Sequence, residues 1–350
     1  MLRIFSVLFA LIFMFSAQPV YAASVDCSAQ RAVVIDALSL EVIYAKNENN
    51  ECSIASTTKI MSALIACESG KMDETVEITF DMVNTHGSLL GLREGDKITL
   101  YDLVAGMLLP SGNDAANAVA LYLADSFEEF SAMMNKKASE LGLYNSYFVT
   151  PSGLDEGDHH STAYDMAVLT AYALKNEYFS EICALSKYDV TINGKKLTVY
   201  NHNKLLSSMD SCVGVKTGYT DKAGRCLVSA FSENGHTFVC VTFNAPDDWN
   251  DHKKLYEYAN KQYQSAEISD AFYVLTVGGE KNSVKGEYSA SVSVLNKNEI
   301  TVELYAFPFI YAPVKQGDEI GKAVIKYKEK ELLTVPVTAC ENVNYYAQQE

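Results

Sequence analysis

The sequence predicts an α/β protein in which helices flank a mixed sheet, with an inserted helical subdomain and a second, all-β domain. Strand-like alternation opens the chain, helical periodicity fills its middle, and strands followed by one helix return before residue 264. After about residue 265 only short alternating runs remain, which is typical of β structure. We therefore expect a signal peptide over 1–23, an α/β domain over 24–264 and a β-rich domain over 265–350.

The N-terminal segment carries the pattern of a secretory signal peptide. Arg3 gives a positive start, residues 4–15 are apolar, and the spacing of Val20 and Ala22 is typical of a cleavage site nearby. The apolar run is shorter than the ~20 residues that a membrane-spanning helix needs, and no later run is long enough. We therefore expect an exported protein.

Local patterns justify the remaining elements in turn. Alternation predicts strands over 31–36 and 41–46, and helical periodicity predicts a helix over 54–68 that ends at Gly70. The elements that follow are two helices flanking residues 110–113, a helix from the capping box of Ser126 and Glu129 to Gly142, a helix from Thr162 to about Leu174, strands over 189–199, 213–217, 225–231 and 236–243, a closing helix over 250–263, and short strands over 292–295, 300–305, 323–327 and 332–337.

Composition and charge exclude several classes of function. About half of the residues are hydrophobic (48%), so a sizeable core is expected, and the formal charge of -16 without a basic run argues against a nucleic-acid partner. The histidines and carboxylates within residues 155–160 could serve as metal ligands, but the chain has only six histidines and no H-x-x-x-H pattern. We expect a surface loop there, and no metal.

The eight cysteines are dispersed and form no C-x-x-C pair. An even count in an exported chain permits disulfides. If Asn234 and Gly235 form a two-residue turn, however, Cys226 faces Phe243 and Cys240 lies on the opposite face of the sheet. We therefore expect most cysteines to be small core residues rather than bridges.

Ser56 and Lys59 stand three positions apart at the start of a predicted helix. Residues i and i+3 share a helix face, so the lysine nitrogen can reach the serine hydroxyl. A serine becomes a nucleophile when a base takes its proton, and Lys59 can be that base if burial or a neighbouring cation lowers its pKa. Alone, this S-x-x-K pattern is equally typical of an ordinary helix start.

Two further triads follow. Ser111-Gly112-Asn113 occupies a turn between two helices, where a hydroxyl and an amide can face a cleft. Lys216-Thr217-Gly218 ends a predicted strand, where a cation and a hydroxyl can face a ligand and the glycine leaves room for it. Each triad alone is typical of a turn or a strand end. The three in this order predict one site that acts through an activated serine.

With these motifs the chain resembles the D-alanyl-D-alanine carboxypeptidases, which are serine-type, low-molecular-weight penicillin-binding proteins. The segments 106–117, 151–155 and 161–167 are also similar to that family. The resemblance covers residues 25–263 strongly and 312–337 more weakly. It implies a β-lactamase/transpeptidase-like fold, a role in peptidoglycan and cell-wall biogenesis and in cell shape, and no cofactor.

The resemblance also implies a mechanism. Ser56 would attack the D-Ala-D-Ala bond of a peptidoglycan stem peptide, and Lys59 would accept its proton. Ser111 would relay a proton to the leaving amine, and Lys216 would help to keep Lys59 neutral. Water would then hydrolyse the acyl-enzyme, and β-lactam antibiotics would be covalent inhibitors.

The implied substrate-binding residues are Asn113, Lys216, Thr217, Gly218 and Tyr219. Asn113 would hold an amide of the substrate, and Lys216 with Thr217 would receive its terminal carboxylate. Gly218 would leave room along the strand, and the backbone N–H of Tyr219 would form the oxyanion hole with that of the nucleophile.

Three features depart from the family pattern. Tyr219 stands where some relatives carry histidine, and Asn201-His202-Asn203 stands near a position where relatives often have Asn-Thr-Asn, a change that we expect to be peripheral. The last residues, 338–350, contain no basic residue, so no clear membrane anchor is expected in the mature chain.

Other activities remain open on the same motifs. A D,D-endopeptidase would use the same residues. A β-lactamase of class A needs a glutamate-bearing loop, and no E-x-x-L-N segment lies between Asn113 and Lys216. An inactive muropeptide-binding protein would usually lack the nucleophile or its base, and here both are present.

Overall fold

Five strands form the central sheet of the α/β domain, in the order β2-β1-β9-β8-β7, and each neighbouring pair is antiparallel. Their bounds are β1 Arg31–Asp36, β2 Val42–Lys46, β7 Cys212–Thr220, β8 Gly224–Glu233 and β9 His236–Phe243. The computed structural model describes residues 25–346, and the predicted signal peptide lies outside the described residues. Because β7 is an edge strand, one side of its backbone is open to a ligand.

The two faces of this sheet bury different cores. Along β1, Val33 and Ile35 belong to a large cluster shared with the helices of the chain's middle, whereas Ala32 and Val34 pack toward α8 (Asp248–Asn260). This alternation follows from the period of two along a strand. The α/β domain is therefore a sheet with helices on both faces, as predicted.

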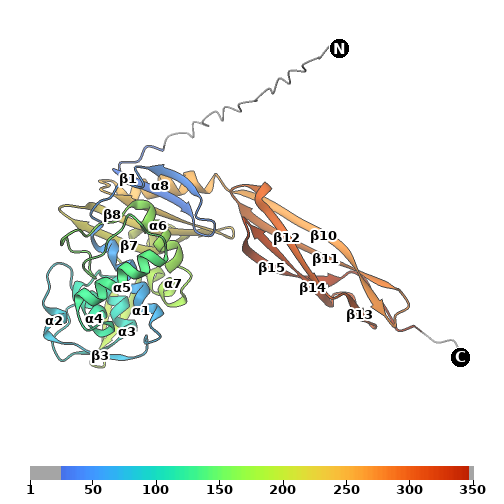
Figure 1. The fold of residues 1–350 in the computed structure, drawn as a ribbon, viewed down its shortest axis with the longest axis horizontal. Helices are drawn as coiled ribbons and strands as arrows, with labels where there is room; N and C mark the ends of the chain where they lie inside the picture. The colour runs from blue at the N-terminus through green and yellow to red at the C-terminus, as the bar shows by residue number, and fades with distance from the viewer. Residues whose placement is uncertain (1–24, 347–350) are drawn as a thin grey trace, which may run out of the picture.

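The helices α2 (Phe80–Val83), α3 (Leu100–Leu108) and α4 (Asn113–Leu123) lie at the end of the α/β domain that is far from the β domain (Figure 1). Ser126 caps α5 and Thr162 caps α6, each accepting a hydrogen bond from the backbone N–H three residues on, as predicted. The helices are α1 Lys59–Glu68, α2 Phe80–Val83, α3 Leu100–Leu108, α4 Asn113–Leu123, α5 Phe127–Glu140, α6 Ala163–Ala173 and α7 Glu177–Ala184, with a small sheet of β3 Thr75–Glu77 and β4 Lys97–Thr99 beside them.

The segment predicted as one strand over 189–199 is instead a hairpin of β5 (Lys187–Ile192) and β6 (Lys195–Tyr200), which forms its own two-stranded sheet. Asn193 and Gly194 join the strands with φ of 51° and 76°. An Asn-Gly pair with two positive φ values is the preferred two-residue hairpin turn. This signal was present in the sequence and our single-strand prediction was wrong.

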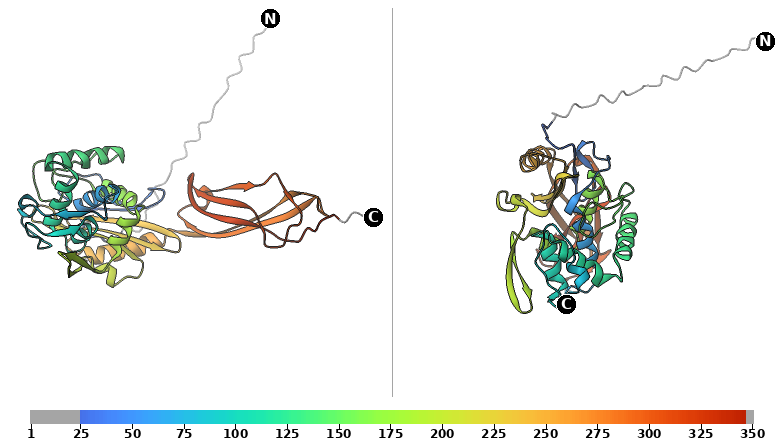
Figure 2. Two further views of the ribbon diagram at one scale, coloured as in Figure 1. Left: turned by 90° about the horizontal axis from the view of Figure 1, so that it is seen from below. Right: turned by 90° about the vertical axis from the view of Figure 1, so that its left-hand side faces the viewer.

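The C-terminal domain is an elongated six-stranded sheet that extends away from the α/β domain (Figures 1 and 2). Its strand order is β12-β14-β15-β11-β10-β13, and two apolar clusters fill it. The strands are β10 Gln264–Val277, β11 Ser283–Val294, β12 Ile300–Ala306, β13 Phe309–Tyr311, β14 Glu319–Tyr327 and β15 Lys330–Ala339. The long strand β10 is absent from our prediction because exposed positions near its end also carry apolar residues, Tyr273, Leu275 and Val277, which hide its alternation in the sequence.

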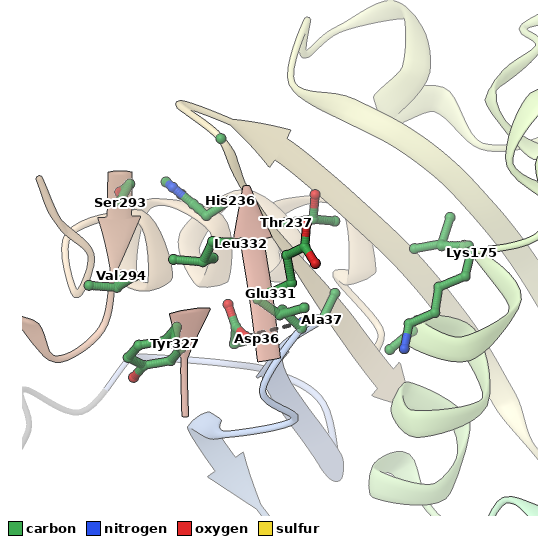
Figure 3. A pocket seen from close by; sticks show the side chains of 14 residues that line it. Asp36, Ala37, Lys175, His236, Thr237, Ser293, Val294, Tyr327, Glu331 and Leu332 are labelled. Carbon is green, nitrogen blue, oxygen red and sulfur yellow. Dashed lines mark hydrogen bonds between the residues drawn. The ribbon is translucent and has the colours of Figure 1, made fainter. Parts of the chain in front are cut away.

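Few polar contacts join the two domains. Glu41 accepts hydrogen bonds from the Tyr327 hydroxyl and the Lys328 ammonium, at 3.0 and 2.8 Å. Lys330 Nζ donates to the backbone oxygen of Leu38 at 2.6 Å. A cavity beside these contacts is lined from both domains, for example by His236 and Glu331 (Figure 3).

The register of the β8–β9 hairpin places Cys226 and Cys240 on opposite faces of the sheet, as expected. Cys226 pairs with Phe243, and Cys240 belongs to the cluster on the other face of the sheet. All eight thiols are free, and most are buried. Within residues 25–346, no helix has the length and apolarity needed to cross a membrane.

Candidate active site

Ser56 lies on a single turn of 3-10 helix, Ala55–Thr58, which leads directly into α1. The turn begins with a strained residue, because Ala55 has a φ of 48°. A left-handed alanine costs about 1 kcal/mol and persists only where its surroundings hold it. Two glycines pack against this turn: a Cβ on Gly153 would lie 1.9 Å from the Ala55 oxygen, and one on Gly218 would lie 3.0 Å from the Ser56 nitrogen.

Lys59 is fully buried and its Nζ has three partners. Ser56 Oγ lies at 2.8 Å, Asn113 Oδ1 at 2.7 Å and the backbone oxygen of Ser152 at 2.7 Å. Burial first, and then repulsion by the Lys216 ammonium, hold the pKa of Lys59 well below its ordinary value, while Asp114 acts in the opposite direction. The predicted nucleophile and base are therefore in contact, in an environment that favours the neutral amine.

The loop between α3 and α4 brings the second triad to the same place. Ser111 adopts a φ of 66° and faces the cavity that Ser56 lines. Asn113 is buried, and its amide nitrogen donates to the backbone oxygen of His86 at 2.6 Å, while its oxygen accepts from Lys59. In this structure Asn113 therefore orients the base and anchors a loop, using one of the two hydrogens of its amide nitrogen.

The third triad, residues 216–218, lies in β7 next to the nucleophile. Thr217, Gly218 and Tyr219 line the cavity. Lys216 is not among the lining residues: it is buried, its Nζ donates to the Thr217 oxygen at 2.9 Å, and burial lowers its pKa to about 7. Contact between Gly218 and the Ser56 nitrogen explains why this position has no side chain.

A cavity of about 570 Å³ opens between these elements, a size suited to a small ligand. Arg225 on β8 also lines it, at the position that pairs with Tyr219. Its guanidinium donates to Asp248 at 2.6 Å and lies over the ring of Trp249, at 5.9 Å from the centroid. Asp248 is buried, so the arginine is held in place while 44% of its side chain remains exposed.

Sequence reasoning missed three residues of this region. Arg225 follows the Lys216 triad by seven to nine residues on the next strand, and a hairpin register drawn from Tyr219 would have found it. His202 lines the cavity, and burial together with the Lys216 charge lowers its pKa. The Asn201-His202-Asn203 segment is therefore not peripheral. His159, expected on a surface loop, is buried and contacts Thr58 in the nucleophile's turn.

Among residues 25–346, no group of three or more His, Cys, Asp or Glu side chains is arranged to hold a metal ion. An activated serine, a buried lysine, an exposed arginine and an open strand edge are together suited to acyl transfer from a peptide that ends in a carboxylate.

Comparison with known proteins agrees with this geometry. The family described as D-alanyl-D-alanine carboxypeptidase matches residues 16–247, and the C-terminal domain of penicillin-binding protein 5 matches residues 250–345. The chain belongs to the D-alanyl-D-alanine carboxypeptidase family. Curated members include DacF of Bacillus subtilis, 33% identical over 90% of this chain and 86% of that protein, and DacC of Escherichia coli, 31% identical over 93% and 86%.

Solved members of the carboxypeptidase fold are similar as well. The D-alanyl-D-alanine carboxypeptidase DacD of Francisella tularensis has a TM-score of 0.64 at 25% identity, over 93% of this chain and 96% of that one. The DD-transpeptidase of Streptomyces K15 has a TM-score of 0.65 at 29% identity, over 67% of this chain and 98% of that one.

Proposed function

We propose that this member of the carboxypeptidase family removes the terminal D-Ala from peptidoglycan stem peptides through an acyl-enzyme on Ser56. The observation that carries the proposal is the contact between the Ser56 hydroxyl and Lys59, a lysine whose pKa is held far below normal. The family names of the relatives supply the substrate class, and the edge of β7 supplies a place for an extended peptide.

In the acylation step Ser56 Oγ forms a bond to the scissile carbonyl carbon while its proton moves to the Lys59 amine. The tetrahedral oxyanion is bound by the backbone N–H groups of Ser56 and Tyr219. The C–N bond then breaks, and the leaving amine of D-Ala takes a proton that travels from Lys59 through Ser111. Water hydrolyses the ester and restores the Ser56 hydroxyl. The charge of Lys216 supports the neutral form of Lys59.

From the sequence we expected Lys216 and Thr217 to receive the terminal carboxylate. Lys216 is buried with its ammonium bonded to the Thr217 oxygen, while Thr217 lines the cavity. We assign the charged contact to Arg225, whose guanidinium shares the cavity with the Thr217 hydroxyl. Gly218 then leaves the strand edge clear for the substrate backbone.

Labelled penicillin provides the direct test. The label should attach to Ser56 of the wild-type protein, and Ser56→Ala should abolish it. Incubation of a pentapeptide stem should release D-Ala, measured by mass spectrometry. Labelling that maps to Ser111 would overturn the assignment of the nucleophile.

A transpeptidase is the second candidate, because one similar structure is a DD-transpeptidase. Both reactions share the acyl-enzyme and differ in whether water or an amine resolves it. Adding an acceptor amine to the pentapeptide assay separates them. Hydrolysis should dominate, and a ligated product as the main species would favour the transpeptidase.

We also propose that the protein acts outside the cytoplasmic membrane, because residues 1–23 have the composition of a signal peptide and peptidoglycan lies there. Expression with and without residues 1–23 tests this. Only the first form should reach the medium or the cell wall fraction with its N-terminus shortened, and intracellular retention of both forms would contradict it.

A further inference from the structure

The peptide group between Ala55 and Ser56 is enclosed on both sides. Gly153 packs against its oxygen and Gly218 packs against its nitrogen. A trans peptide is planar, so its C=O and N–H point in opposite directions. Whatever fixes the Ala55 oxygen therefore also fixes the direction of the Ser56 N–H, which has no backbone acceptor among residues 25–346 and faces β7.

His159 holds the Ala55 oxygen through Thr58. Thr58 Oγ1 donates to that oxygen at 2.9 Å and lies 2.8 Å from His159 Nε2. On the other side of the imidazole, Nδ1 accepts from the backbone N–H groups of Val149 and Thr150, at 3.0 and 3.3 Å. Those two groups can only donate, so the ring proton must be on Nε2. Thr58 Oγ1 therefore accepts a hydrogen bond from the Nε2–H of His159, and its own hydroxyl donates a hydrogen bond to the Ala55 oxygen.

The surroundings keep this arrangement in one form. The imidazole is 3% exposed, and its edge meets the ring of Phe148. Burial lowers its pKa to about 4; the charged groups around it are Asp155, which raises the pKa, and His160 and Lys222, which lower it. At neutral pH the ring is therefore uncharged, and the direction of the two hydrogen bonds does not change.

We propose that His159 is a positioning residue for the oxyanion hole. By holding the strained Ala55 carbonyl through Thr58, it keeps the Ser56 N–H directed toward the edge of β7, where the oxyanion forms. The inference rests on the proposed acyl transfer at Ser56. It adds a function for a residue that touches neither the nucleophile nor the cavity.

The effect should appear in the transition state more than in substrate binding, because the oxyanion exists only there. Two amide variants separate the roles of the ring nitrogens. Glutamine at position 159 can place a donor near the position of Nε2, which serves Thr58. Asparagine reaches only the position of Nδ1, so His159→Asn keeps the contact with Val149 and loses the one with Thr58.

The experiment compares His159→Gln, His159→Asn, Thr58→Val and Thr58→Ser in the full chain. For each we would measure kcat and KM with a D-Ala-D-Ala peptide and the affinity of a peptide boronic acid, which forms a tetrahedral adduct on serine. His159→Asn and Thr58→Val should lower kcat and boronate affinity roughly ten- to a hundredfold, with KM nearly unchanged. His159→Gln and Thr58→Ser should retain most of both.

Thr170→Val is the matched control, because Thr170 is another buried threonine whose hydroxyl is bonded to a backbone oxygen, that of Met166 in α6. It should leave kcat and boronate affinity unchanged. The inference is overturned if folded Thr58→Val or His159→Asn keeps wild-type boronate affinity, or if Thr58→Ser loses as much as Thr58→Val. Absence of penicillin labelling at Ser56 in the wild type would instead overturn the proposed function.

Discussion

The hydrogen-bond partners of Lys59 fit an amine better than an ammonium. A neutral amine has two hydrogens and one lone pair. Asn113 Oδ1 and the Ser152 oxygen are fixed acceptors for the two hydrogens, so the lone pair is left facing Ser56 Oγ. These two acceptors therefore hold the lysine in the orientation that it needs to act as a base. Asn113 and Ser152 lie 54 and 93 residues from Lys59 in the chain.

Replacing Lys59 by arginine tests that role. The guanidinium keeps the positive charge but does not deprotonate in proteins, so it cannot accept the serine proton. We expect the rate of penicillin acylation to fall by about a thousandfold or more. Quenched time points of labelling with a fluorescent penicillin measure the acylation rate, and thermal melting checks the fold. The control is Lys204→Arg, at a lysine that lines the same cavity. Near-wild-type acylation would contradict the assignment.

Arg225 makes a separate prediction about the substrate carboxylate. Arg225→Gln removes the charge, and a hydrogen bond to a charged group contributes about 1.5–3 kcal/mol, so kcat/KM should fall roughly ten- to a hundredfold. The loss should disappear when the substrate ends in a carboxamide, because the pair no longer exists. Measuring acid and amide substrates with Arg225→Gln and with Lys204→Gln gives the comparison. An equal loss on both substrates would assign Arg225 to structure through Asp248 instead.

At the scale of elements, α8 is joined to the sheet by a buried histidine. His252 is fully buried, with Ser229 of β8 on one ring nitrogen and Thr242 of β9 on the other. Burial lowers its pKa to about 3. This contact replaces apolar packing at one point between the helix and the two central strands, and it ties the attachment of α8 to pH.

Acid should therefore weaken the domain through His252. Between pH 6.5 and about 3 the unfolded chain binds this proton and the folded chain does not, so the free energy of unfolding falls as the pH falls. From pH 6.5 to 4 the loss is about 3 kcal/mol, at about 1.4 kcal/mol per pH unit. Chemical denaturation at several pH values measures it. His252→Gln should be less stable at pH 7 but show a shallower slope, and an unchanged slope would exclude this residue as the cause.

At the scale of the whole molecule, the catalytic residues and the elongated β domain belong to separate parts of the chain. The residues that line the cavity around Ser56 all come from the α/β domain. The β domain contacts that domain at Leu38 and Glu41, in the segment between β1 and β2. Tyr263, the last residue before β10, stacks on His236 and bonds Asp36, which closes the first domain. We propose that residues 24–264 form the catalytic unit.

A chain that ends at residue 264 tests this division. Its rate of penicillin acylation should stay within about twofold of that of the full chain, because no cavity residue is removed. Shortening the chain to residue 260 is the informative contrast, since it removes Tyr263 and should lower the melting temperature. A folded 24–264 fragment that is not acylated would show that the β domain contributes to the site.

The sequence by itself determined the features that depend on neighbours along the chain. The three-residue spacing of Ser56 and Lys59, the caps of α5 and α6 and the register of the β8–β9 hairpin all follow from local geometry, and the structure agrees with each. The Asn193-Gly194 hairpin was also readable, and was missed because its flanking residues alternate like one strand.

Only the tertiary structure decided which groups surround the nucleophile and in what charge state. Arg225 lies in the cavity beside Tyr219 because β7 and β8 pair in one register, and Lys216 is buried with its ammonium bonded to the Thr217 oxygen. His159 meets Thr58 across 101 residues, and burial lowers the pKa values of both the histidine and Lys59. Contacts over such separations and the loss of water around a charge are set by how the elements pack, and local periodicity carries no record of either.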